Sequence, residues 1–186
     1  MKLRSSVSIA IAVALIGITT SSAWADGNKG KTFSTRLSGY NETPLTLNST
    51  GSGEFSATVN KDGSISYTLS YRDLASPVLQ AHIHFGRPAI TGQIVLFLCT
   101  NLTPPVGVPM PQACPQQGTI SGTLTAADVI ARPTQGIDSA AAGLAEMVKA
   151  MRASAAYANV HTQTFPSGEI RGTVGPSDDE DENDDD

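Results

Sequence analysis

The chain has 186 residues, with 12 basic and 17 acidic side chains and a formal net charge of −5. Eight of the acids lie in the terminal run 178–186, so the rest of the chain is nearly neutral and offers no basic patch for nucleic acid. We expect one ordinary domain over 26–176 and a disordered acidic tail over 177–186, because a run of like charges repels itself.

The N-terminal segment has the pattern of an export signal. Lys2 and Arg4 precede an apolar run over 7–18, and Ala23-Trp24-Ala25 forms a small-x-small cleavage pattern. We predict a secretory signal peptide over 1–25 that is cleaved after Ala25. The apolar run is short for a membrane span, and no later stretch is apolar enough to form one. The mature chain is therefore expected to be a soluble protein that is secreted or periplasmic.

β-Strands dominate the first half of the mature chain. Residues 32–37 predict a first strand, and the segments 54–60 and 64–71 alternate between apolar and polar residues on either side of Asp62-Gly63. An Asp-Gly pair between two alternating segments is typical of a hairpin with one buried and one solvent-exposed face.

Two further strands follow the predicted hairpin. Residues 79–85 form a strand that contains His82 and His84, and a turn over 86–92 leads into residues 93–99. This last segment is apolar on both faces, so we expect it to be covered on both sides, near the middle of the structure.

The segment 100–117 contains five prolines and is expected to be irregular. Cys99 and Cys114 are the two cysteines of the chain, and they enclose most of this segment. In an exported protein such a pair predicts a disulfide, which closes a loop of ~15 residues and contributes about 3 kcal/mol.

The second half of the chain adds three strands and a short helical turn. Residues 119–124, 155–161 and 169–174 predict strands, the last two as a hairpin. Thr125 and Asp128 predict a capped helical turn directly after the first of these strands.

An amphipathic helix is predicted over 138–153, capped by Asp138 or Ser139. Its apolar residues recur with helical spacing and form one stripe toward the core, made of Leu144, Met147, Val148 and Met151. About eight strands and one helix indicate a mostly β fold, an antiparallel β-sandwich or barrel with an inserted amphipathic helix.

The three histidines of the chain all fall on predicted strands. Residues i and i+2 of a strand share a face, so His82 and His84 point the same way, with apolar residues on the other face. In the late strands, His161 also lies opposite the apolar residues, as do Glu169 and Arg171. If the three strands are neighbours, these polar side chains form one cluster on the face away from the core.

Two interpretations of this cluster are open. In the structural one, Glu169 and Arg171 pair with each other or with histidines across strands, at roughly 0.2–1 kcal/mol per pair. In the functional one, His82, His84 and His161 bind copper or zinc, with a water or Glu169 in a fourth position. No serine or cysteine has the context of an activated nucleophile, so the sequence favours a non-enzymatic role.

Several sequence blocks occur in a specific order. They are Leu37-Ser38-Gly39-Tyr40-Asn41-Glu42-Thr43-Pro44, Ala81-His82-Ile83-His84-Phe85-Gly86, the strand from Gly118 that runs into Thr125-Ala126-Ala127-Asp128, Tyr157-Ala158-Asn159-Val160-His161-Thr162, and Gly168-Glu169-Ile170-Arg171-Gly172. In this order they resemble the CHRD domain, which recurs in chordin and stands alone in many exported microbial proteins. The resemblance covers roughly 31–175 and implies an extracellular β-rich module with no established catalytic activity. We expect its partner to be an extracellular protein or a cell-surface or matrix ligand.

A second resemblance concerns the histidines. His82 and His84 on one strand of a β-barrel, with a disulfide and the later His161 and Arg171, look like copper–zinc superoxide dismutase. That family needs more imidazoles than three, a bridging ligand and a metal-binding Asp, so we expect no dismutase activity. The alternative function is a copper- or zinc-binding protein with a dismutase-like strand site.

Overall fold

The structure is a computed structural model that describes residues 31–138 and 141–177. The predicted signal peptide and the acids of the tail lie outside these residues, as does Ser139, one of the two expected helix caps. Within the described ranges, no helix has the length and hydropathy needed to cross a membrane.

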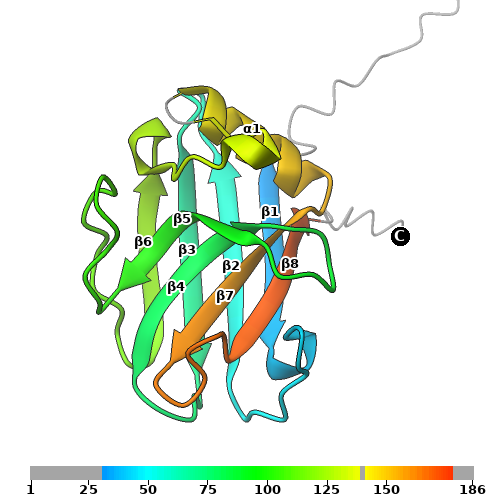
Figure 1. Ribbon diagram of the computed structural model, residues 1–186, viewed down its shortest axis with the longest axis vertical. Coiled ribbons are helices and arrows are strands. Elements are labelled where there is room, and N and C mark those ends of the chain that lie inside the picture. The colour runs from blue at the N-terminus through cyan, green and yellow to red at the C-terminus, as the bar shows by residue number, and fades with distance from the viewer. Residues whose placement is uncertain (1–30, 139–140, 178–186) are drawn as a thin grey trace, which may run out of the picture.

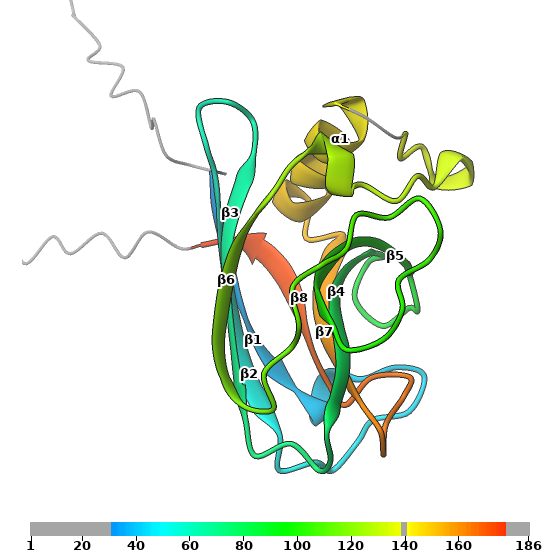
Figure 2. The ribbon, with the colours of Figure 1, turned by 90° about the vertical axis from the view of Figure 1, so that its left-hand side faces the viewer.

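Eight strands form one continuous antiparallel sheet in the order β5-β4-β7-β8-β1-β2-β3-β6. Their bounds are β1 Thr32–Ser38, β2 Ser52–Val59, β3 Ile65–Arg72, β4 Val78–Phe85, β5 Gln93–Thr100, β6 Gly118–Leu124, β7 Ala156–Thr162 and β8 Ile170–Pro176. The sheet folds over on itself into two layers, one with β5, β4, β7 and β8 and the other with β1, β2, β3 and β6 (Figures 1 and 2). The predicted fold class, an antiparallel β-barrel with one helix, is confirmed.

The core lies between the two layers and follows from the alternation of the strands. In the β2–β3 hairpin, Phe55 and Leu69 face each other across the strands and are 1% and 0% exposed. The hairpin turn at Asp62-Gly63 is formed as predicted, with the Gly63 backbone at a positive φ of 84°. Apolar residues of one face therefore supply the packed interior of this layer.

Helix α1, Ala141–Arg152, covers one end of the barrel (Figure 1). Its four predicted core residues, Leu144, Met147, Val148 and Met151, are all buried. The described helix begins at Ala141, and Asp138 precedes it: its backbone amide donates to the Glu146 carboxylate at 2.8 Å. Burial of one apolar stripe accounts for the position of the helix.

Three short 3-10 turns complete the fold: η1 Gly39–Asn41, η2 Ala126–Asp128 and η3 Pro133–Gln135. The predicted capped turn is η2, where the Asp128 carboxylate accepts hydrogen bonds from the backbone amide and the hydroxyl of Thr125 at 2.7 and 2.8 Å. The predicted disulfide is also present and joins Cys99 to Cys114 with a Cα–Cα distance of 5.0 Å.

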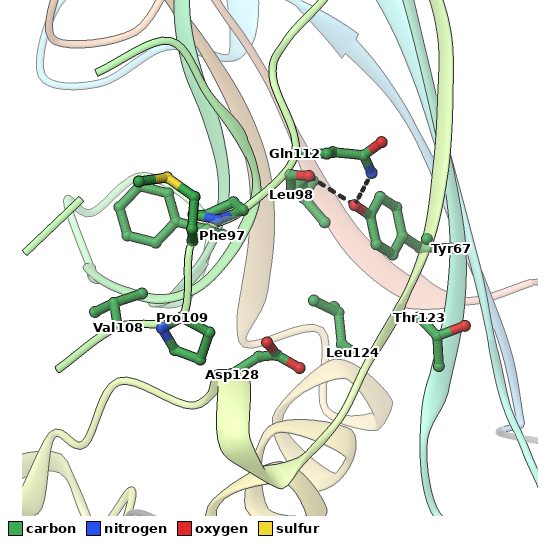
Figure 3. A pocket seen from close by; sticks show the side chains of 12 residues that line it. Tyr67, Phe97, Leu98, Val108, Pro109, Gln112, Thr123, Leu124 and Asp128 are labelled. Carbon is green, nitrogen blue, oxygen red and sulfur yellow. Dashed lines mark hydrogen bonds between the residues drawn. The ribbon is translucent and has the colours of Figure 1, made fainter. Parts of the chain in front are cut away.

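The prediction that β5 lies near the middle of the structure is wrong, because β5 is an edge strand of the sheet. Its residues 95–100 are nevertheless buried, as the apolar sequence indicates. One face packs into the core, while Phe97 on the other face lies beside Val108 and Pro109 of the proline-rich segment (Figure 3). A loop rather than a neighbouring strand therefore provides the second cover.

The two edge strands, β5 and β6, meet at a seam that side chains close. The Tyr67 hydroxyl donates to the Leu98 carbonyl at 2.6 Å, and the Gln112 amide donates to the Tyr67 oxygen at 2.8 Å (Figure 3). The Gln112 amide also donates to the Ser121 carbonyl at 3.0 Å. A cavity of about 170 Å³ lies in this seam. The polar groups of Tyr67 and Gln112 are paired with each other and with backbone, which is a structural role.

Candidate metal centre

The strand register brings all three histidines of the chain to one face of the layer formed by β5, β4, β7 and β8. On β4, His82 and His84 lie on the face opposite Ile83, and on β7, His161 lies opposite Val160. Strand β4 pairs with β7, so His82 lies across from Asn159, and His161 lies two residues further along β7. The condition under which the sequence groups the three histidines, that their strands are neighbours, is therefore met.

This face is not exposed to solvent as the face of an ordinary sheet layer would be. His82 is 0% exposed, and His84 and His161 are each 6% exposed. Phe97 packs edge-on against His82 with ring centroids 4.4 Å apart. The 86–92 turn and the 164–168 turn cover the two other rings through backbone contacts.

The three imidazole rings form a compact triangle. Their centroids lie 4.9 Å apart for His82 and His161, 5.5 Å for His82 and His84, and 6.0 Å for His84 and His161. One ring nitrogen from each histidine lies within 4.8 Å of the other two. A metal ion bound at 2.0–2.1 Å needs these nitrogens about 3.5 Å apart, so the distance between any two of them has to shorten by at most about 1.3 Å.

Backbone carbonyls fix the orientation of two rings. Nδ1 of His84 lies 3.1 Å from the Gly92 carbonyl oxygen, and Nδ1 of His161 lies 3.0 Å from the Pro166 carbonyl oxygen. A carbonyl can only accept, so each Nδ1 carries the proton and each Nε2 presents its lone pair. This is the arrangement by which metal-binding histidines are oriented in proteins.

The remaining ring nitrogens have no hydrogen-bond partner. Both nitrogens of His82 and Nε2 of His84 and His161 are buried and unpaired. Buried polar atoms in folded proteins are nearly always satisfied, and each orphan costs roughly 1–3 kcal/mol. Four such atoms lie in this one cluster.

Burial also favours the neutral form of the three rings. Desolvation lowers the pKa of His82 well below its usual value, lowers that of His161, and lowers that of His84 to about 3. Neighbouring positive charge adds to this effect at His84, where Arg171 and Arg132 both act in the same direction. Neutral imidazole is the form that binds metal.

The comparison with protein families bears on the whole barrel. The CHRD domain matches residues 33–174, from the first strand to the last. The chain belongs to the CHRD family. No curated protein and no solved structure gives a significant match to it. The resemblance inferred from the ordered sequence blocks is therefore confirmed, and the histidines lie within the matched domain.

Arg171 and Glu169 of the CHRD domain do not pair with each other, and each has other partners. Arg171 donates to the Ile90 carbonyl at 2.8 Å, and its guanidinium carbon lies 3.4 Å above the ring of Tyr157. Tyr157 is in turn stacked on His84, with centroids 4.6 Å apart and ring planes at 7°. Arg171 thus contacts the Tyr157 ring on which His84 is stacked.

Glu169 is fully buried and accepts three hydrogen bonds away from the imidazole rings. Its donors are the Ser49 hydroxyl at 2.6 Å, the Thr162 hydroxyl at 2.7 Å and the Ala75 backbone amide at 2.8 Å. These contacts join three separate chain segments at one carboxylate. They favour a structural role for Glu169 over the fourth metal ligand considered from the sequence.

Glu42 was not singled out by sequence reasoning, although it lies in the CHRD blocks. It is 8% exposed, and its carboxylate accepts from the Asn159 amide at 2.6 Å. Desolvation raises its pKa to about 7, against the opposing effects of Asn159 and Arg171. Glu42 reaches Asn159 from a loop, and in a loop no periodic pattern indicates which side chains point inward.

Proposed function

We propose that this CHRD domain is an exported, non-enzymatic binding module for a transition-metal ion, held by His82, His84 and His161. The observation that carries the proposal is the set of four buried ring nitrogens without partners, on three rings whose ligand atoms lie within 4.8 Å of one another. A bound ion would satisfy three of these atoms at once.

The chemistry of the donors supports copper or zinc as the class of ion. Imidazole suits both metals, and the carbonyls of Gly92 and Pro166 hold two rings with Nε2 directed toward the cluster. The nitrogens are shielded from solvent, which supports a binding role over catalysis at an open coordination position. Hard ions such as calcium, which prefer oxygen ligands, do not fit this donor set.

Export is the second part of the proposal. CHRD domains are extracellular, and the Cys99–Cys114 disulfide fits an oxidising compartment. The basic and apolar pattern of residues 1–25 would supply the signal. An extracellular or matrix ligand bound elsewhere on the domain is compatible with a metal centre inside it.

Elemental analysis and titration with Cu and Zn test the metal proposal. Tag-free protein is required, because the three histidines of the site are all the histidines of the chain. We expect one ion per wild-type chain and at least ~100-fold weaker binding after His84→Ala or His82→Ala. Gln80→Ala is the matched control, because Gln80 lies on the same strand, half-buried, two residues before His82. Negligible metal in wild type and variants alike would refute the proposal.

A further inference from the structure

The candidate metal centre offers three neutral donors and no anionic one. Among the described residues, the group able to hold an ion consists of His82, His84 and His161 alone. The two buried carboxylates nearby have other partners, since Glu169 accepts from Ser49 and Thr162 and Glu42 accepts from Asn159. No ligand would therefore neutralise any part of the charge of a bound ion.

Two arginines lie close to His84. Both Arg171 and Arg132 lower the pKa of His84 by their proximity, and the Arg132 side chain is held by the Ile94 carbonyl at 2.9 Å. The cost of moving an ion from water into a poorly polarisable interior grows with the square of its charge, so a divalent ion pays about four times as much as a monovalent one. A buried site with only neutral ligands therefore disfavours a divalent ion relative to a monovalent one.

Solvent cannot complete a larger coordination shell in this geometry. The unpaired nitrogens of all three rings have essentially no solvent-accessible surface, and Phe97 closes the side next to His82. Zinc in proteins is almost always four-coordinate, and a three-histidine zinc site takes water as its fourth ligand. Monovalent copper, in contrast, is stable with three ligands because its single charge needs fewer donors than the double charge of zinc.

Resting on the proposed metal-binding function, we infer that the ion is monovalent copper, held by His82, His84 and His161 in a three-coordinate site closed to water. The lack of an anionic ligand, the two arginines near His84 and the exclusion of a fourth, water ligand favour this ion over zinc. The module would then hold copper in its reduced form and keep it from solvent, which suits storage or transfer of the ion.

The test compares Cu(I) with Zn(II) on the tag-free, disulfide-intact protein. Cu(I) is supplied without oxygen as its acetonitrile complex, so that no thiol reductant opens the Cys99–Cys114 bond. Competition against chromogenic chelators of each ion gives the two dissociation constants. We expect one Cu(I) per chain, a dissociation constant at least ~1000-fold lower than for Zn(II), and an X-ray absorption edge and scattering that fit three nitrogen ligands.

Histidine NMR gives a second measurement that does not depend on a variant that folds. Cu(I) is diamagnetic, and all three imidazoles of the chain belong to the site. We expect the CH signals of the three rings to shift together and to stop moving at one equivalent of Cu(I). Zn(II) that binds at one equivalent as tightly as Cu(I), or a four-coordinate copper, would overturn this inference and leave the metal-binding function standing. Failure of both ions to bind would overturn both.

Discussion

The guanidinium carbon of Arg171 lies over the ring of Tyr157, 3.4 Å from its centroid, and that ring is stacked on His84. An arginine on β8 therefore reaches a histidine on β4 through one aromatic ring on the strand between them. Planar stacking of this kind depends on the shape of the guanidinium as well as on its charge.

Arg171→Lys should separate these two contributions. The lysine keeps the positive charge but loses the planar stack and the geometry of the hydrogen bond to the Ile90 carbonyl. We expect a loss of about 1–2 kcal/mol in the free energy of unfolding, measured by urea titration, and about 10-fold weaker metal binding. Arg36→Lys is the control, because Arg36 is exposed and contacts Glu54 at 3.9 Å; an equal effect there would contradict the prediction.

Gly92→Ala should disturb the support of His84 without touching its ring. A β-carbon at Gly92 would collide with the Phe85 carbonyl, so the backbone that accepts from His84 and donates to Tyr157 must move. We expect a loss of about 2 kcal/mol or more in stability and a 10- to 100-fold loss of metal affinity by titration.

A glycine in open space provides the comparison for that substitution. Gly107 has a positive φ of 86° but nothing near its β-carbon position. Gly107→Ala should cost about 1 kcal/mol through backbone strain and leave metal affinity unchanged. If Gly92→Ala behaves in the same way as Gly107→Ala, the Gly92 carbonyl does not position His84.

The metal-free protein should lose stability as the pH falls below about 6.5. In the unfolded chain the histidines take the ordinary pKa of 6.5, whereas burial lowers the pKa of all three in the folded state, that of His84 to about 3. The unfolded chain therefore binds more protons in this window, and each histidine costs about 1.4 kcal/mol of stability per pH unit of acidification.

Glu42 acts in the opposite direction over part of the same range. Its pKa rises from 4.5 to about 7 on folding, so its contribution to stability is present below pH 4.5 and is lost as the pH rises through 7. The effect of this one carboxyl on the pH dependence of stability is opposite to that of the three imidazoles and smaller than their sum. Stability should therefore still rise with pH. Urea midpoints between about pH 5 and pH 7 should show a steeper rise for Glu42→Gln than for wild type. A flat profile for both proteins would contradict the prediction.

Glu169→Gln should damage the fold and spare the metal centre. The glutamine places an amide donor where the carboxylate accepts from Ser49, Thr162 and the Ala75 amide, so at least one buried donor loses its partner. We expect a loss of about 1–3 kcal/mol in stability. Metal affinity of the folded variant, measured by chelator competition, should equal that of wild type. Glu54→Gln, at an exposed position on β2, should change neither quantity.

The strand pattern could be predicted from the sequence because alternation is a local property. Period-two hydrophobicity placed the β2–β3 hairpin and put His82 and His84 on a common face, as the structure confirms. The position of β5 could not be predicted in this way. A segment that is apolar on both faces indicates cover on both sides, and cover by the loop around Val108 gives the same pattern as cover by a strand.

The candidate site was predictable in its ligands but not in its surroundings. Alternation along β4 and β7 grouped the histidines, whereas their burial depends on Phe97 and on backbone carbonyls of two turns. Every residue type has a backbone carbonyl, so these contacts cannot be predicted from the pattern of side chains along the sequence. Glu42 meets Asn159 across 117 positions of the chain, and a loop residue at that separation carries no periodic signal.

The seam between β5 and β6 has a consequence for the behaviour of the protein at high concentration. The outer edge of β5 is occupied, because the carbonyls of Ile94, Val95 and Leu98 accept from Arg132, the Ile130 amide and the Tyr67 hydroxyl. An open strand edge is a template on which a second molecule can add a strand and begin aggregation. With these acceptors taken, the edge of β5 is a poor template for edge-to-edge association, although the two edge strands of the sheet do not pair with each other.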